Sequence, residues 1–196
     1  MQIAPTSLSG VVVLTPRVFS DARGRFCETW SRARLAEAGI DIDFVQDNES
    51  LSRPVGTLRG LHYQSPPMAQ AKLVRVVAGA ILDVAVDVRR GSPRYGQWVG
   101  VELSADSGRQ LLVPAGFLHG FVTRVPDTVV GYKCSAPYAP ECDGAVAFGD
   151  PDLAIDWGLD PAAAVISDKD ARAPRFRDWT SPFDYTGPLP WEGADA

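Results

Sequence analysis

The stretch KLVRVVAGAILDVAVDV, residues 72–88, decides the fold class of this chain. β-Branched residues dominate residues 72–77 and 80–88, which is typical of strands, and Ala78-Gly79 between them marks a turn. The stretch therefore predicts two strands joined as a hairpin. Since side chains alternate between the faces of a strand, the second strand sets Leu82, Val84 and Val86 against Asp83, Ala85 and Asp87.

Short strand-like segments continue on both sides of this stretch. They are separated by glycine and proline, which number 18 and 16, and they cover residues 11–14, 97–103, 109–113, 120–123, 129–135 and 144–148. Many short strands with frequent turns favour an all-β sandwich or barrel, with the jelly roll as a common solution. One helix is predicted over residues 31–38, with Ser31 as its cap and Gly39 at its end.

The chain is expected to form a single domain over residues 1–196, because no repeat or linker divides it. The core is expected at about residues 10–176. Residues 178–196 are expected to be an irregular C-terminal tail that frays at 192–196.

Composition narrows the function classes. Hydrophobic residues make up 45% and charged residues 22%, as in ordinary soluble proteins, and the net charge of -5 argues against nucleic-acid or anionic-membrane partners. The N-terminus has no signal-peptide pattern, and no apolar run approaches the roughly 18 residues of a membrane span. The cysteines, Cys27, Cys134 and Cys142, lack metal-ribbon spacing, so we expect reduced thiols in a cytoplasmic protein.

Both histidines of the chain lie in strand-like segments. His62 is in RGLHYQ, residues 59–64, and His119 is in GFLHGF, residues 116–121. Histidine suits proton transfer near neutral pH because its unperturbed pKa is about 6.5, although a structural role is the alternative for each. Two histidines are too few for a three-histidine metal site, so no metal is expected.

Two features near these segments place charged groups on an inner face. Arg59 and His62 have opposite strand parity, but a bulge at Gly60 would bring both side chains to one face. Lys72 shares the parity of Val74 and Val76, which predicts a cation inside the barrel. The alternative is a lysine at the strand mouth that extends its ammonium to water.

Three further clusters combine groups that handle protons or anions. They are Arg23 and Glu28 beside Phe19 and Phe26, Tyr132 with Tyr138, and Asp168 with Asp170. A carboxylate from the last pair can orient a histidine ring and raise its basicity. The alternatives are a solvated turn, structural tyrosines and a surface charge run.

Ordered motifs over about residues 14–176 carry a family resemblance: FSDARGRFCE (19–28), QDNES (46–50), GTLRGLHYQ (56–64), KLVRV (72–76), VPAGFLHGF (113–121), YKCSAPY (132–138) and SDKD (167–170). The chain resembles the dTDP-4-dehydrorhamnose 3,5-epimerase family of dTDP-sugar epimerases. This resemblance implies a cupin-like jelly roll, a homodimer that exchanges N-terminal strands, and an enzyme without metal or other cofactor.

The resemblance also implies residue roles. His62 matches the catalytic base with Asp170 as its partner, Tyr132 matches the acid on the opposite face of the sugar, and Lys72 matches the cation beside the C4 oxygen. Arg59 and His119 match substrate and diphosphate contacts. The matching nucleotide-sugar ligands are Arg23, Glu28, Gln46, Asn48, Tyr138, Asp143 and Lys169. Asp143 departs from the family pattern, where glutamate is frequent.

These residue types suit the implied reaction, which inverts C3 and C5 of dTDP-4-dehydro-6-deoxy-D-glucose to give dTDP-4-dehydro-L-rhamnose. Both carbons flank the C4 ketone, so a cation that stabilises the enolate makes their protons removable. A base and an acid on opposite faces then invert each carbon. Three alternatives stay open: an epimerase of C3 or C5 alone, a metal-dependent cupin oxygenase or isomerase, and a noncatalytic nucleotide-sugar binding module.

Overall fold

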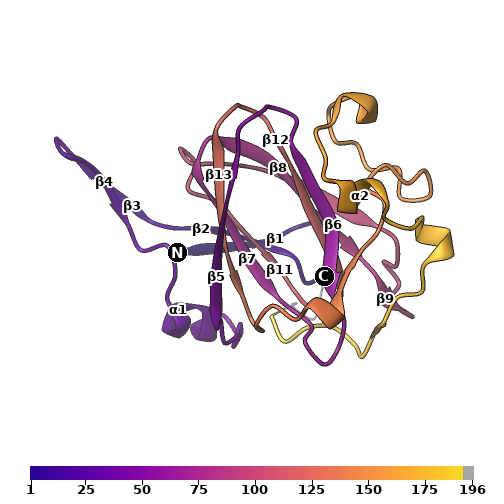
Figure 1. Ribbon diagram of the computed structural model, residues 1–196. Coiled ribbons are helices and arrows are strands. Elements are labelled where there is room, and N and C mark those ends of the chain that lie inside the picture. The colour runs from indigo at the N-terminus through magenta and orange to yellow at the C-terminus, as the bar shows by residue number, and fades with distance from the viewer. Residues whose placement is uncertain (192–196) are drawn as a thin grey trace.

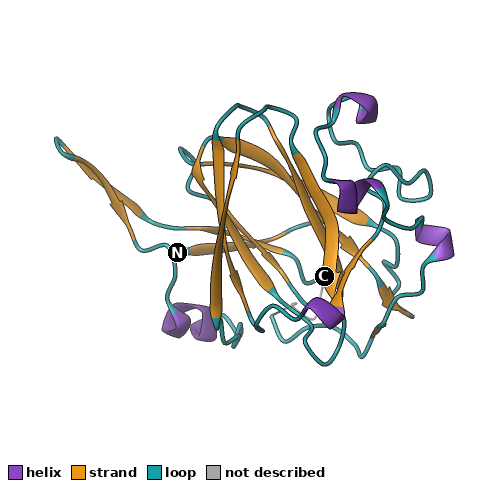
Figure 2. Ribbon diagram, in the orientation of Figure 1, coloured by secondary structure: helices purple, strands orange, loops and turns teal. Residues whose placement is uncertain are grey.

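The computed structural model describes residues 1–191 and consists mainly of two antiparallel β-sheets packed face to face (Figures 1 and 2). The six-stranded sheet has the order β1 (Gln2–Pro5), β2 (Val12–Thr15), β11 (Gln110–Val113), β7 (Lys72–Ala78), β13 (Thr128–Cys134) and β5 (Gln46–Ser52). The five-stranded sheet has the order β10 (Trp98–Ser104), β8 (Ala80–Asp87), β12 (Phe117–Thr123), β6 (Leu58–Gln64) and β14 (Asp143–Ala145). The predicted jelly-roll sandwich is confirmed.

The main core lies between the two sheets. Alternate residues of β7, Val74 and Val76, point inward and meet Ala85 of β8 and Phe121 of β12. Burial of this apolar surface is the dominant force that holds the sheets together, at about 25 cal/mol per Å². The same inward parity places Lys72, two residues before Val74, between the sheets.

The predicted hairpin across Ala78-Gly79 is wrong. β7 pairs with β11 and β13, whereas β8 pairs with β10 and β12, so the turn carries the chain from one sheet to the other. Gly79 has a φ of 86°, and a Cβ there would lie 2.4 Å from Thr128 Oγ1. Glycine is therefore needed at this corner of the sandwich.

A second apolar cluster covers the outer face of the five-stranded sheet. Val84 and Val86 of β8 pack outward against Val146, Trp157 and Phe183 from the C-terminal third of the chain. β8 is consequently buried on both faces, which explains its nearly continuous apolar sequence. Asp83 and Asp87 of β8 are fully buried as a result.

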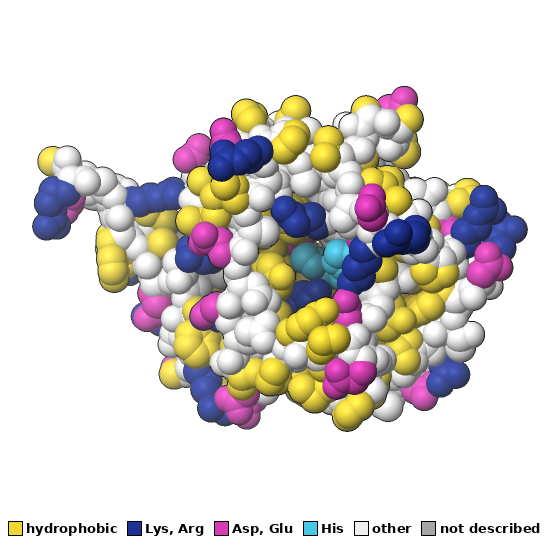
Figure 3. All heavy atoms as spheres, in the orientation of Figure 1, with side chains coloured by type: hydrophobic (Ala, Val, Ile, Leu, Met, Phe, Trp, Pro, Cys, Tyr) yellow, Lys and Arg dark blue, Asp and Glu magenta, His cyan; other side chains and the backbone are white. Residues whose placement is uncertain are grey.

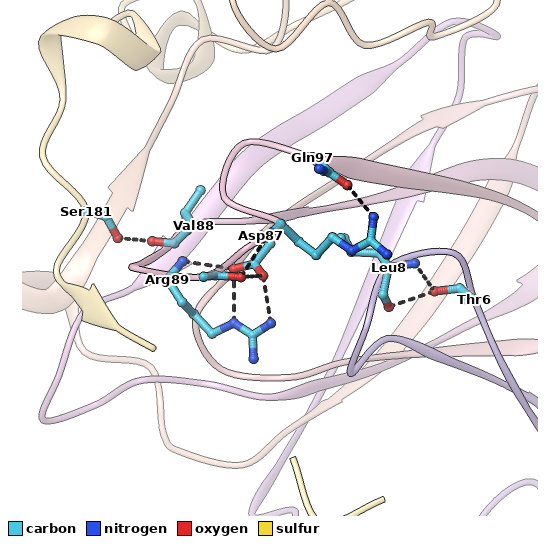
Figure 4. Close-up of polar contacts among 9 residues, drawn as sticks. Thr6, Leu8, Asp87, Val88, Arg89, Gln97 and Ser181 are labelled. Carbon is cyan, nitrogen blue, oxygen red and sulfur yellow. Dashed lines mark hydrogen bonds and ion pairs between the residues drawn. The ribbon is translucent and has the colours of Figure 1, made fainter. Parts of the chain in front are cut away.

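The C-terminal segment is anchored beside the end of β8. Figure 4 shows the Arg89 guanidinium on the Asp87 carboxylate, with Nε 3.0 Å from Oδ1 and Nη2 2.7 Å from Oδ2. Ser181 donates a hydrogen bond to the Val88 carbonyl, and β15 (Phe183–Asp184) pairs in parallel with β9 (Arg89–Arg90). The predicted tail therefore packs on the sandwich as far as residue 191, and the predicted fraying at 192–196 lies outside the described residues.

Small elements complete the fold. Helix α1 (Arg32–Glu37) is capped by Ser31 and followed by Gly39 with a φ of 79°, as predicted, and its Leu35 packs on the outer face of the six-stranded sheet. Helix α2 (Asp168–Ala171) lies beside β6, and short 3-10 helices occupy Pro140–Cys142, Pro161–Ala163 and Phe176–Asp178. The hairpin of β3 (Val18–Asp21) and β4 (Gly24–Cys27) projects away from the sandwich (Figure 1). Within residues 1–191, no helix is long and apolar enough to cross a membrane.

Candidate active site

A cavity of about 380 Å³ opens between the two sheets; we call it the central pocket. In Figure 3 the histidine side chains, in cyan, lie in a hollow with lysine and arginine side chains around it. The pocket is lined by Ser50, Thr57, Leu58, Arg59, His62, Lys72, His119, Phe121, Tyr132, Val165, Ile166, Ser167 and Asp170. It thus brings together Arg59, His119 and the four predicted catalytic residues.

A β-bulge gives Arg59 and His62 a common face. From His119 to Phe121, β12 advances two residues while β6 advances three, from His62 back to Arg59. Gly60 sits in the bulge with a φ of 132°, and a Cβ there would approach Gly120 Cα to 2.5 Å. The bulge predicted from parity is confirmed, and both side chains line the central pocket.

His62 is held by Asp170. The His62 Nε2 and Asp170 Oδ1 atoms are 2.5 Å apart, whereas Asp168, two residues earlier on α2, is exposed. Burial raises the pKa of Asp170, but hydrogen bonds from His62, Ser167 and the Gly60 backbone outweigh it and hold that pKa below its usual value. The carboxylate therefore stays ionised beside the ring, and it fixes which ring nitrogen faces the pocket.

His119 has a similar partner that the sequence analysis missed. Its Nε2 lies 2.7 Å from Asp83 Oδ1, and Asp83 is fully buried on β8. His119 also lies directly across from His62 in the β6–β12 pair. The available signal was the parity of Asp83, which placed a carboxylate on the face of β8 opposite Leu82, Val84 and Val86.

Lys72 and Tyr132 approach the pocket from the opposite sheet. Lys72 Nζ lies 6.0 Å from the centre of the Tyr132 ring. Burial lowers the pKa of Lys72 and raises the pKa of Tyr132, because a poorly solvated site disfavours the charged form of each. The interior position predicted for Lys72 is confirmed.

The remaining predicted ligands divide into two groups. Five are outside the lining of the central pocket but contact one another or Tyr132. Gln46 Oε1 accepts a hydrogen bond from the Tyr138 backbone at 2.9 Å, and Asn48 lies opposite Tyr132 in the β5–β13 pair. Lys169 contacts the Asp143 carboxylate, which also accepts from the Tyr138 hydroxyl.

Arg23 and Glu28 are not brought to the central pocket of their own chain. Arg23 lies at the tip of the β3–β4 hairpin, paired with Asp21, and its side chain is 90% exposed. Glu28 pairs with Arg34 at 2.7 Å. Sequence spacing alone gives no sign of this separation.

Within residues 1–191, no group of three or more His, Cys, Asp or Glu side chains is arranged to hold a metal ion.

Comparisons with known proteins identify the family of this chain. The family model described as dTDP-4-dehydrorhamnose 3,5-epimerase matches residues 5–178. A protein of that name from Sinorhizobium fredii is 47% identical over 185 residues, covering 94% of each chain.

Solved structures extend the comparison. A 3,5-epimerase from Legionella pneumophila, in complex with dTDP-4-keto-L-rhamnose, is 42% identical with a TM-score of 0.90, covering 95% of this chain and 99% of that one. A 3'-monoepimerase from Streptomyces bikiniensis, in complex with dTDP-quinovose, is 38% identical with a TM-score of 0.81, covering 87% and 86%. The family match over most of the chain, the relatives and the shared fold together show that this chain belongs to the dTDP-4-dehydrorhamnose 3,5-epimerase family.

Proposed function

We propose that this chain inverts C3 and C5 of dTDP-4-dehydro-6-deoxy-D-glucose and so forms dTDP-4-dehydro-L-rhamnose in dTDP-L-rhamnose biosynthesis. The observation that carries the proposal is the pairing of His62 and Asp170 on one side of the central pocket with Tyr132 and Lys72 on the other. A hexose between them meets a base on one face and an acid on the opposite face.

The proton steps follow from this arrangement. His62 removes the proton from the carbon beside the ketone, and Asp170 stabilises the imidazolium that forms. The electron pair moves onto the C4 oxygen, where the Lys72 ammonium stabilises the enolate. Tyr132 then delivers a proton to the other face of the carbon as the C4 ketone forms again. Proton exchange with solvent restores neutral His62 and protonated Tyr132, and the same steps at the second carbon complete the double inversion.

The second candidate is inversion of one carbon only. The structural relative from Streptomyces bikiniensis is a 3'-monoepimerase, which motivates this candidate, but the identity to the 3,5-epimerase from Legionella pneumophila is higher, 42% against 38%. Incubation with dTDP-4-keto-6-deoxyglucose in D₂O, followed by NMR, tests the two. We expect deuterium at both C3 and C5 of the product, and deuterium at a single carbon would favour the monoepimerase.

We further propose a homodimer in which the β3–β4 hairpin of one protomer reaches the site of its partner. Phe19 and Phe26 on this hairpin are 51% and 71% exposed, unusual values for large apolar side chains that stand close together. Arg23 lies at the hairpin tip, so delivery to a second copy would give its guanidinium an anionic diphosphate to bind.

Mixed dimers test this exchange. Arg23→Ala and His62→Ala each inactivate every site of their own homodimer, but a mixture of the two contains dimers with one complete site. We expect activity to return on mixing after subunit exchange. Two inactive variants that stay inactive in a demonstrated mixed dimer would show that Arg23 acts within its own chain.

The proposal also covers the domain organisation and the cellular location of the protein. The single domain over residues 1–196 is supported by the apolar clusters, which link the C-terminal segment to β8. A cytoplasmic location is supported by the proposed substrate, because nucleotide-activated sugars are made from nucleoside triphosphates.

A further inference from the structure

A relay of two amide side chains leads from the Tyr138 backbone to the neighbourhood of Tyr132. The Tyr138 backbone N–H donates to Gln46 Oε1 at 2.9 Å, and Gln46 Nε2 donates to Asn48 Oδ1 at 3.0 Å. Asn48 Nδ2 then points toward β13, where it lies 3.6 Å from Cys134 Sγ. Asn48 is also the direct cross-strand neighbour of Tyr132, so the two side chains share one face of the sheet.

The direction of this relay is fixed by its first member. A backbone N–H can only donate, so the Gln46 oxygen must face Tyr138 and the Gln46 NH₂ group must face Asn48. That NH₂ group in turn needs the Asn48 oxygen, because a flipped Asn48 would set two donors against each other. The Asn48 NH₂ group is therefore left to face Tyr132 and Cys134, as a donor.

A donor on this side has a consequence for the tyrosine. The Asn48 NH₂ group lies across the strand pair from Tyr132 and 3.6 Å from Cys134 Sγ, and as a donor it opposes the rise that burial causes in the pKa of Tyr132. A tyrosine oxygen with a donor on its β5 side directs its own O–H away from β5, and Tyr132 lines the central pocket. The relay thus orients the acidic proton toward the place that the hexose would occupy.

We infer that Asn48 is a positioning residue for the proton donor Tyr132, turned into a donor by Gln46 and the Tyr138 backbone, in addition to any contact with the nucleotide. This inference rests on the proposed function, because it assigns Asn48 to the reprotonation step. It links the Tyr138 backbone to Tyr132, which lines the central pocket, without requiring that Asn48 touch the hexose.

Asn48→Asp tests the inference because it keeps the shape of the side chain and replaces the donor with an acceptor. We expect epimerised product to form about 10- to 100-fold more slowly. Complete loss of a general acid costs roughly 10²–10⁴-fold, and the expected effect is smaller because Tyr132 itself is retained. Exchange of substrate protons with D₂O should persist, since His62 is unchanged, and the basic limb of the kcat profile should move to higher pH. The decisive readout is the ratio of epimerisation to proton exchange at saturating substrate, because a change in dTDP affinity lowers both rates together.

A second variant, Gln46→Glu, alters the orientation of the Asn48 amide without replacing either Asn48 or Tyr132. In Gln46→Glu the new carboxylate still accepts from Tyr138, but it now attracts the Asn48 NH₂ group and turns the Asn48 oxygen toward Tyr132. We expect the same separation of product formation from proton exchange. The inference can therefore be tested with Gln46→Glu even where Asn48→Asp folds poorly. Glu49→Gln is the matched control, because Glu49 is the exposed neighbour of Asn48 on the opposite face of β5.

Two results would overturn the inference: normal epimerisation by both variants, or equal loss of exchange and epimerisation. The wild-type protein is measured first with dTDP-4-keto-6-deoxyglucose. A wild type that neither exchanges nor epimerises refutes the proposed function itself, whereas an active wild type whose variants behave alike in exchange and epimerisation refutes only the role of Asn48.

Discussion

His62 Nε2 and Asp170 Oδ1 lie 2.5 Å apart although 108 residues separate them in the chain. The contact joins strand β6, at the bulge, to the short helix α2. The side chain of Asp170 is 3% exposed and that of His62 is 30% exposed, so the carboxylate is sealed behind a ring that still reaches the pocket. A base with its orienting group on the protein side is thereby open to substrate on the other side.

Replacing Asp170 with asparagine should slow turnover, because a neutral amide cannot balance the charge of the imidazolium that forms when His62 takes a proton. Asp168→Asn should leave turnover unchanged because Asp168 is exposed on α2. Steady-state kinetics of both variants checks this, and a loss confined to Asp168→Asn would transfer the role of partner to Asp168.

His62→Ala should lower kcat by about 10²–10⁴-fold, the usual effect of losing a general base. The side chain is partly exposed and its hydrogen-bond partner is Asp170, so the far-ultraviolet circular dichroism should stay native. Steady-state kinetics checks the rate. Turnover close to that of the wild type would exclude His62 as the base.

Tyr132→Phe should separate two events that the wild type couples. The base remains, so substrate protons should still exchange with D₂O, but epimerised product should be lost because no acid serves the opposite face. NMR of recovered substrate and product distinguishes the two. Product formed at the wild-type rate would mean that another group protonates the enolate.

Lys72→Met should lower kcat much more than it raises KM, because a charge on the C4 oxygen develops only as the enolate forms. Methionine keeps much of the apolar stem, and loss of a buried ammonium should not harm folding, since burial already lowers the pKa of Lys72. Initial-rate kinetics gives both constants. An effect confined to KM would make Lys72 a binding residue.

Gly60→Ala should destabilise the protein and disturb the bulge that aligns Arg59 with His62. The added Cβ would meet Gly120 Cα at 2.5 Å and a φ of 132° would strain any L-residue, so a loss of about 2–4 kcal/mol in unfolding free energy is expected. Gly91→Ala is the control, because Gly91 has a φ of 85° with nothing within 4 Å of its added Cβ. Urea unfolding should show about 1–2 kcal/mol for the control and unchanged activity.

Much of this protein follows from sequence because the relevant patterns are local. Alternation along a strand depends only on the period of the extended backbone, and it correctly predicted the interior position of Lys72 and, with Gly60, the bulge beside His62. The cap of α1 at Ser31 is equally local. The ordered motifs identified the family because many residues had to match together.

Other features were decided only by tertiary structure, because they depend on which distant segments meet. Gly79 marks a turn whether β7 and β8 form a hairpin or enter different sheets. The outcome depends on which strands supply the backbone hydrogen bonds: β11 and β13 pair with β7, and β10 and β12 pair with β8. The choice of Asp170 over Asp168 depends on the phase of α2 against β6, and the Asp83–His119 contact depends on the register of β8 against β12. Sequence fixes the period of each segment, whereas contacts between segments depend on their relative register, which only the packed sandwich sets.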